Sequence, residues 1–226
     1  MERIAVTIAR DQLDQTLDTL DQIPETRTRI APAAWITATA LGILAIAAGL
    51  VLPDVTGDPG GMTHYMGLLA ANQPWNLLLF MAVPVILAET LAITELVILY
   101  TQGAAPAWVH TLSRVAGLVA GPWFLAITTY LLTNAVVPLT TGAGWAGPAD
   151  IIAVGAYLAG VVPLVGITLI ELGILGRGGA RARMRLHATF VGVFLVVAHV
   201  AMIFGMLDPT LLGWNPANSM HAGHGM

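Results

Sequence analysis

Long apolar runs separated by short polar segments form the pattern of this chain from residue 31 onward. The runs lie near residues 33–52, 76–100, 113–136, 151–175 and 187–206. Each is about as long as the roughly 20 apolar residues that cross the hydrocarbon of a bilayer. A backbone in lipid satisfies its polar groups within a helix or a closed barrel, and runs of this length favour the helix. The pattern predicts an all-α integral membrane protein with five transmembrane helices.

The two ends of the chain differ from this pattern. Leu13, Leu17 and Leu20 form a stripe at helical spacing with aspartates alongside, which indicates an amphipathic helix. Anionic lipid repels such an acidic helix, so its expected partner is a cytoplasmic protein; a solvated tail packed on the bundle is the alternative. We predict three regions: a cytoplasmic amphipathic N-terminal segment (1–30), a five-helix transmembrane domain (31–207) and a tail containing Met and His (208–226).

Composition and charge then set the class and the orientation. The chain is 57% hydrophobic and 10% charged, with a mean hydropathy of +0.79, which is too apolar for a soluble domain of 226 residues. All nine basic residues are arginine, and seven flank the apolar runs on one side: Arg27, Arg29, Arg114, Arg177, Arg181, Arg183 and Arg185. The loops of the other side contain Asp54, Asp58, Asp150 and Asp208 and no arginine. The positive-inside rule predicts a multi-pass protein of the bacterial cytoplasmic membrane, with the N-terminus cytoplasmic and the C-terminus extracytoplasmic.

Ionisable residues are rare within the apolar runs. Apart from Arg114 at the start of one run, they are Glu89, Glu95, Glu171, His187 and His199, with His110 at the mouth of a helix. Such a residue at a bilayer centre costs roughly 2.5–3.5 kcal/mol, so a partner or a task is expected. A carboxylate beside an imidazole can relay a proton or bind a divalent metal ion. We predict that all six residues form a transport or proton-relay site.

The rise of a helix separates these six residues into two depths. Glu95, Glu171, His110 and His187 fall near the cytoplasmic ends of four helices, where snorkelling to water is the alternative to a function. Glu89 and His199 lie nearer the middle, where little reach to the interface remains, and form the predicted deep pair. Pro84, Pro122 and Pro163 lie inside three runs, and each leaves a backbone carbonyl free to face a cavity.

Methionine and histidine gather on the predicted outer side. The two groups are Met62, His64 and Met66 after the first outer loop, and Met220, His221, His224 and Met226 in the tail. Thioether and imidazole groups select copper, so these seven residues are candidate copper ligands; packing of Met62 and Met66 one turn apart is the alternative. The chain has no cysteine, which excludes a disulfide and a thiolate metal site.

These residues favour a permease-like protein that handles a transition-metal ion, copper first, or protons through a buried Glu–His pair. One alternative is a redox subunit or anchor that binds haem b or copper in a larger complex. Haem b is disfavoured because His187 and His199 point about 120° apart around their helix. The other alternative is a non-catalytic scaffold. No catalytic residue is identified, and five helices are few for a carrier, so we expect a homo-oligomer or a partner membrane subunit. No feature indicates nucleic-acid binding.

Overall fold

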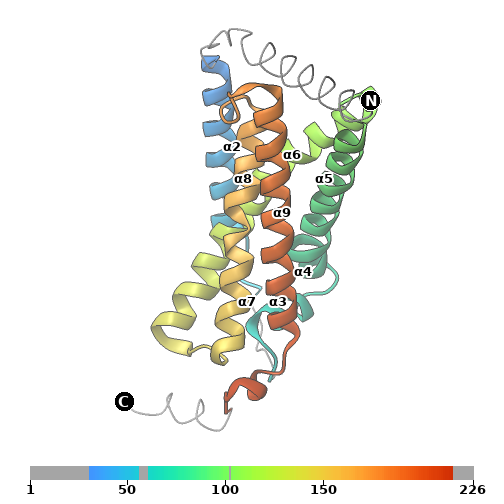
Figure 1. The fold of residues 1–226 in the computed structure, drawn as a ribbon. Helices are drawn as coiled ribbons and strands as arrows, with labels where there is room; N and C mark the ends of the chain where they lie inside the picture. The colour runs from blue at the N-terminus through green and yellow to red at the C-terminus, as the bar shows by residue number, and fades with distance from the viewer. Residues whose placement is uncertain (1–30, 56–60, 102, 216–226) are drawn as a thin grey trace, which may run out of the picture.

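The computed structural model describes residues 31–55, 61–101 and 103–215, and this part of the chain is helical without strands. Five helices in it are long and apolar enough to span a membrane (Figure 1). They cover Pro32–Val51, Trp75–Tyr100, Ala107–Gly142, Gly147–Glu171 and Arg181–Met206. The five predicted spans are therefore confirmed as helices. The predicted N-terminal amphipathic segment lies outside the described residues.

The five spans alternate in direction along one axis (Figure 1). The α-helices are α2 (Pro32–Val51), α3 (His64–Ala70), α4 (Trp75–Leu77), α5 (Val83–Tyr100), α6 (Ala107–Leu131), α7 (Gly147–Ala159), α8 (Val161–Glu171) and α9 (Gly179–Met206). Three π-helical segments, η1 (Leu78–Ala82), η2 (Leu132–Val136) and η3 (Leu139–Ala143), and the 3₁₀ turn η4 (Pro209–Leu212) complete the described elements. The third span is longer at both ends than the apolar run at 113–136 predicts, because it begins at Ala107 and continues through η2 and η3.

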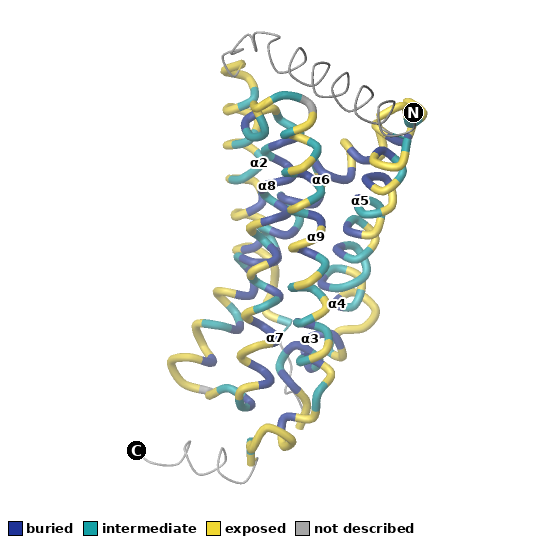
Figure 2. Tube along the Cα trace, viewed as in Figure 1, coloured by how far each residue is buried: buried dark blue, intermediate teal, exposed yellow. Residues whose placement is uncertain are grey.

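Helix α6 lies at the centre of the bundle. It packs against α2, α5 and α8, while α7 and α9 pack on each other. The buried side chains form one apolar core that includes Phe80, Phe124 and Tyr157. The outer faces of α2 and α5 are exposed and apolar (Figure 2), as expected for helices that face lipid tails.

A proline explains how the second span connects to its neighbours. Pro84 has no N–H to give to the carbonyls of the turn before it, and the chain forms the π-helical segment η1 there. The Trp123 Nε1–H donates to the carbonyl of Leu79 at 3.2 Å, and the Tyr157 hydroxyl donates to that of Phe80 at 2.5 Å. The carbonyls therefore take partners from α6 and α7, which ties the second span to the bundle.

A short helix closes one end of the bundle. We call this end, with Asp150 and Asp208, the aspartate-bearing end, and the opposite end, with Arg114 and the arginines from Arg177 to Arg185, the arginine-bearing end. The Thr63 hydroxyl donates to the carbonyl of Gly205 in α9, and Tyr65 packs on Tyr157 of α7 with 5.4 Å between ring centroids. His64 lies between them and binds Asp150 of α7. Three consecutive residues thus hold α3 against α7 and α9.

Candidate functional site

The ionisable cluster at the arginine-bearing end is built from three helices. Helix α5 contributes Glu95, one and a half turns before its end, and α8 contributes Glu171 as its last residue. Helix α9 contributes Arg183 and His187 from its first turns. We call these four residues the His187 cluster. The chain reverses direction between α8 and α9, which brings Glu171 to the depth of His187.

The imidazole of His187 lies between the two carboxylates. Its Nδ1 atom is 2.9 Å from Oε2 of Glu95, and its Nε2 atom is 3.5 Å from Oε1 of Glu171. Neither ring nitrogen makes a well-aligned hydrogen bond, and the imidazole forms an ion pair with these carboxylates only when it is protonated. His187 is 4% exposed and Glu95 is 6% exposed. These two side chains are therefore packed inside the chain instead of snorkelling to water.

Arg183 completes the cluster toward solvent. Its Nη2 atom donates to Oε2 of Glu171 at 3.1 Å, and its side chain is 45% exposed while that of Glu171 is 9% exposed. The contacts therefore run in the order Glu95, His187, Glu171, Arg183, with the exposed arginine at one end. Gly117 of α6 permits this arrangement, because a Cβ atom there would lie 3.0 Å from Cγ of Glu171.

A hollow of about 330 Å³ gives access to the cluster. It is lined by all four cluster residues together with Ile98, His110, Ser113, Arg114 and Met184. His110 is exposed and makes no ion pair among the described residues. The structure thus brings together three of the four residues predicted at this end and leaves the fourth at the edge of the hollow.

The donor set of the cluster does not fit a metal centre. Each nitrogen of His187 faces a different carboxylate, so the ring lies between the two acids. A metal centre instead needs the imidazole nitrogen and the carboxylate oxygens to surround one common position. Within the described residues, no three His, Cys, Asp or Glu side chains are placed to hold an ion. The arrangement suits proton exchange, because an imidazole can take a proton on one nitrogen and release one from the other.

Glu89 and His199 line a second site, a groove of about 210 Å³ between α5 and α9. Both residues are exposed on the described helices, so the chain itself does not enclose the predicted deep pair. They make no hydrogen bond or ion pair with each other among the described contacts. His199 Nδ1 lies 2.6 Å from the carbonyl of Leu195, in its own helix. Hydropathy places a residue at a depth, but it does not fix the side of the helix on which the residue lies.

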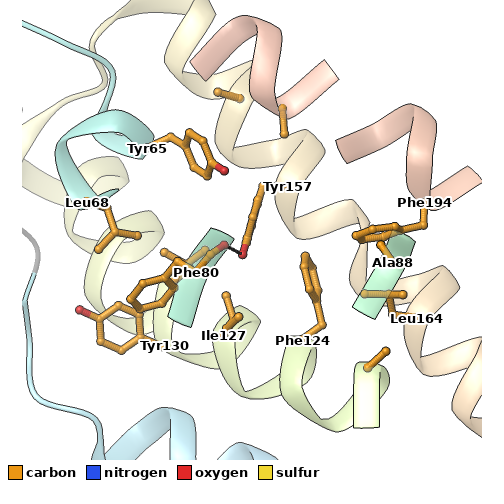
Figure 3. Close-up of a cluster of buried hydrophobic side chains, with 14 of the residues drawn as sticks. Tyr65, Leu68, Phe80, Ala88, Phe124, Ile127, Tyr130, Tyr157, Leu164 and Phe194 are labelled. Carbon is orange, nitrogen blue, oxygen red and sulfur yellow. Dashed lines mark hydrogen bonds between the residues drawn. The ribbon is translucent and has the colours of Figure 1, made fainter. Parts of the chain in front are cut away.

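Aromatic rings of the buried core, labelled in Figure 3, also line this α5–α9 groove. Tyr65, Tyr157, Phe124 and Phe194 make a continuous row, with ring centroids 5.4, 5.0 and 5.7 Å apart in that order. Burial raises the pKa of Tyr65, which lies outside the spans, to about 12, so its hydroxyl stays neutral at physiological pH. The other lining residues are Phe80, Met81, Pro84, Val85, Ala88, Leu195, Val197, Ala198 and Met202.

The predicted copper ligands at the aspartate-bearing end separate into two environments. Met62 and Met66 line a hollow of about 300 Å³ together with Met206 and Asp208. His64 instead turns to Asp150, with Nδ1 2.6 Å from Oδ2. The tail ligands Met220, His221, His224 and Met226 lie outside the described residues. A copper site of these seven residues stays a prediction.

Two residues that contact the predicted site residues, Arg183 and Asp150, were not predicted as site residues from the sequence. Arg183 counted only toward the orientation, although its place four residues before His187 put both side chains on one helix face. Asp150 also counted only toward orientation, yet it is fully buried. Its signal was weak, because an aspartate in the first turn of a helix is ordinary at the surface.

Comparisons with known proteins give one match. A family model matches residues 61–221, and its description reads "Family of unknown function (DUF6803)". No curated protein and no solved structure matches the chain significantly.

Proposed function

Since the chain belongs to DUF6803, a family of unknown function, we propose its function from the site itself: it is a proton-coupled permease of a membrane. The observation that carries the proposal is the buried imidazole of His187, with one nitrogen facing Glu95 and the other facing Glu171. We propose that a proton enters and leaves the protein through this His187 cluster.

Charge balance supports a proton-binding role. Two ionised carboxylates and the Arg183 guanidinium leave the cluster with one excess negative charge when His187 is neutral. A proton on His187 makes the cluster neutral. In a buried site of low dielectric, an uncompensated charge is unfavourable, so the cluster is suited to hold one exchangeable proton.

Access to the cluster supports transport over static storage. The hollow beside it is also lined by Arg114 and His110, so water can approach the cluster from the arginine-bearing end, where Arg183 is its exposed member. By the predicted orientation this end faces the cytoplasm. The α5–α9 groove begins farther along the same two helices and provides a space for a second solute.

The second candidate is a structural role in a scaffold. The same contacts join α5, α8 and α9, so the cluster also stabilises the bundle whether or not protons pass. A structural role predicts that removal of His187 lowers stability and changes no proton movement.

Proton flux in reconstituted liposomes tests the proposal. The vesicles contain a pH-sensitive dye, and a potassium gradient with valinomycin drives proton entry. We expect wild-type flux above that of empty vesicles, and His187→Gln to lower it by about tenfold or more, as is common when a proton-transfer group is removed. Glu95→Gln should behave similarly. His110→Gln is the matched control, because this imidazole lines the same hollow without an ion pair.

The outcomes separate the two candidates. Equal flux through wild-type and His187→Gln vesicles contradicts the relay, as does wild-type flux no greater than that of protein-free vesicles. Size-exclusion profiles of each variant in detergent show whether it is folded. If His187→Gln fails this check, Glu95→Gln gives the answer, because it removes one charge of the cluster and keeps the shape of the side chain.

A further inference from the structure

The α5–α9 groove combines an apolar body with two polar groups, which is the usual character of a small-molecule site. It is walled by α5 and α9 and backed by the row of rings from Tyr65 to Phe194. Glu89 and His199 are exposed along it. Exposed to hydrocarbon alone, each would be unfavourable, so an occupant that offers them a polar partner is favoured.

Both polar groups present acceptors to the groove. Glu89 is the only acidic residue among its described lining residues. The carbonyl of Leu195 can only accept, so Nδ1 of His199 carries the proton of that 2.6 Å contact. In the neutral ring, Nε2 is then left with its lone pair. A ligand that donates or carries positive charge fits these two groups, and an anion does not.

The aromatic rings of the groove also favour a positively charged ligand. The face of an aromatic ring attracts a cation, and Tyr65, Tyr157, Phe124 and Phe194 line the groove in one row (Figure 3). Met81 and Met202 add polarizable thioethers that adapt to apolar groups of different shape. No arginine lies among the described lining residues to oppose a cation.

We propose that the α5–α9 groove binds a lipophilic organic cation, with Glu89 as its counter-ion and the aromatic row as the surface for its apolar body. This inference rests on the proposed function, for which it names the substrate class. The cation would exchange for the proton held at the His187 cluster, which begins at Glu95, six residues farther along α5.

Equilibrium binding to the full chain in nanodiscs tests this assignment. The probes are benzyltrimethylammonium and neopentylbenzene, which share one shape and differ in the charge on a single central atom. We expect the cation to bind more tightly than its neutral isostere. Glu89→Gln should weaken binding of the cation by about tenfold and leave the isostere unchanged, as expected for a partly desolvated charge pair. Asp208→Asn is the matched control, because this carboxylate lies outside the groove.

Each result supports or overturns the inference. Equal affinity for the cation and the isostere overturns it, and so does unchanged binding of the cation in Glu89→Gln. If Glu89→Gln does not fold, His199→Leu gives a second measurement, with weaker cation binding expected because the acceptor is lost and no aromatic ring replaces it. The binding measurement applies no proton gradient, so it is independent of the flux measurement. If the cation does not bind while the proton flux is intact, the proposed substrate class is wrong and the proposed relay still stands. If His187→Gln still binds the cation while its proton flux equals that of the wild type, the proposed relay is wrong and the proposed cation site still stands.

Discussion

Asp150 shows what a single buried polar residue does in this fold. Its Oδ1 atom accepts the backbone N–H of His64 at 2.8 Å, and its Oδ2 atom accepts the N–H of Ala146 at 3.2 Å and faces Nδ1 of His64 at 2.6 Å. It is 0% exposed. A buried carboxylate is stable when its oxygens are fully hydrogen-bonded, and this one holds α3 on α7.

Asp150→Asn should therefore destabilise the protein. An amide group has one acceptor oxygen in place of two, so it leaves at least one N–H of His64 or Ala146 without a partner. We expect a loss of about 2–4 kcal/mol, the order for breaking a buried polar pair. Unfolding in mixed detergent and SDS, followed by circular dichroism, measures it.

Asp208→Asn is the control for this measurement. Asp208 is exposed and its carboxylate accepts from the N–H and hydroxyl of Thr210. Its loss should leave the stability nearly unchanged because water replaces these bonds. If both variants unfold alike, Asp150 does not hold α3 in the way its contacts indicate.

At the scale of the helices, the packing of α6 on α8 depends on a hydroxyl group that bonds the backbone of the neighbouring helix. Thr168 of α8 accepts from the N–H of Gly121 at 3.2 Å and donates to the carbonyl of Gly117 at 2.6 Å. These two backbone groups lie one turn apart on α6. Close approach of the helices is possible because Gly121 has no side chain.

Gly121→Ala should separate these helices locally. A Cβ atom there would lie 2.2 Å from Thr168 Oγ1 and 2.9 Å from the carbonyl oxygen of Leu164, which is backbone and cannot turn aside. We expect a loss of about 1–3 kcal/mol, typical of overpacking. The matched control is Gly155→Ala in α7, where a Cβ atom meets nothing within 4 Å and helix propensity favours alanine. Destabilisation of equal size in both variants would argue against this packing.

The sequence predicted the transmembrane helices better than it predicted the site. Apolar runs of about 20 residues or more predicted all five spans, because the bilayer sets a minimum apolar length for a helix that crosses it. The same reasoning placed Glu95, Glu171 and His187 at one depth, where they meet. It did not separate them from His110, nor foresee that Glu89 and His199 are exposed. These differences depend on how far each helix is rotated about its axis, which its neighbours decide and hydropathy does not.

At the scale of the whole molecule, the distribution of charge makes the orientation testable. Arg114 and the arginines from Arg177 to Arg185 lie where α5 meets α6 and α8 meets α9, and Asp150 and Asp208 lie toward the opposite end. The positive-inside rule predicts that the arginine-bearing end is cytoplasmic.

Single cysteines can report this orientation directly, because the chain has none of its own. We expect Leu211→Cys, at a side chain 71% exposed, to react in intact cells with a maleimide that does not cross membranes. Ala104→Cys, exposed between α5 and α6, should react only after permeabilisation. The reverse labelling pattern would mean that the protein has the opposite orientation, and labelling of both sites in intact cells would exclude a fixed one.

The way α2 is attached has a consequence for how the protein assembles during synthesis. Its buried residues are Ala45 and Gly49, and α6 is its main partner. A Cβ atom at Gly49 would lie 2.4 Å from the carbonyl oxygen of Ala126, so the two backbones meet almost directly. Among the five described spans, the first to be synthesised thus has its main partner in the third. Until α6 is inserted, α2 lacks this packing surface, and its apolar side chains favour the lipid without it.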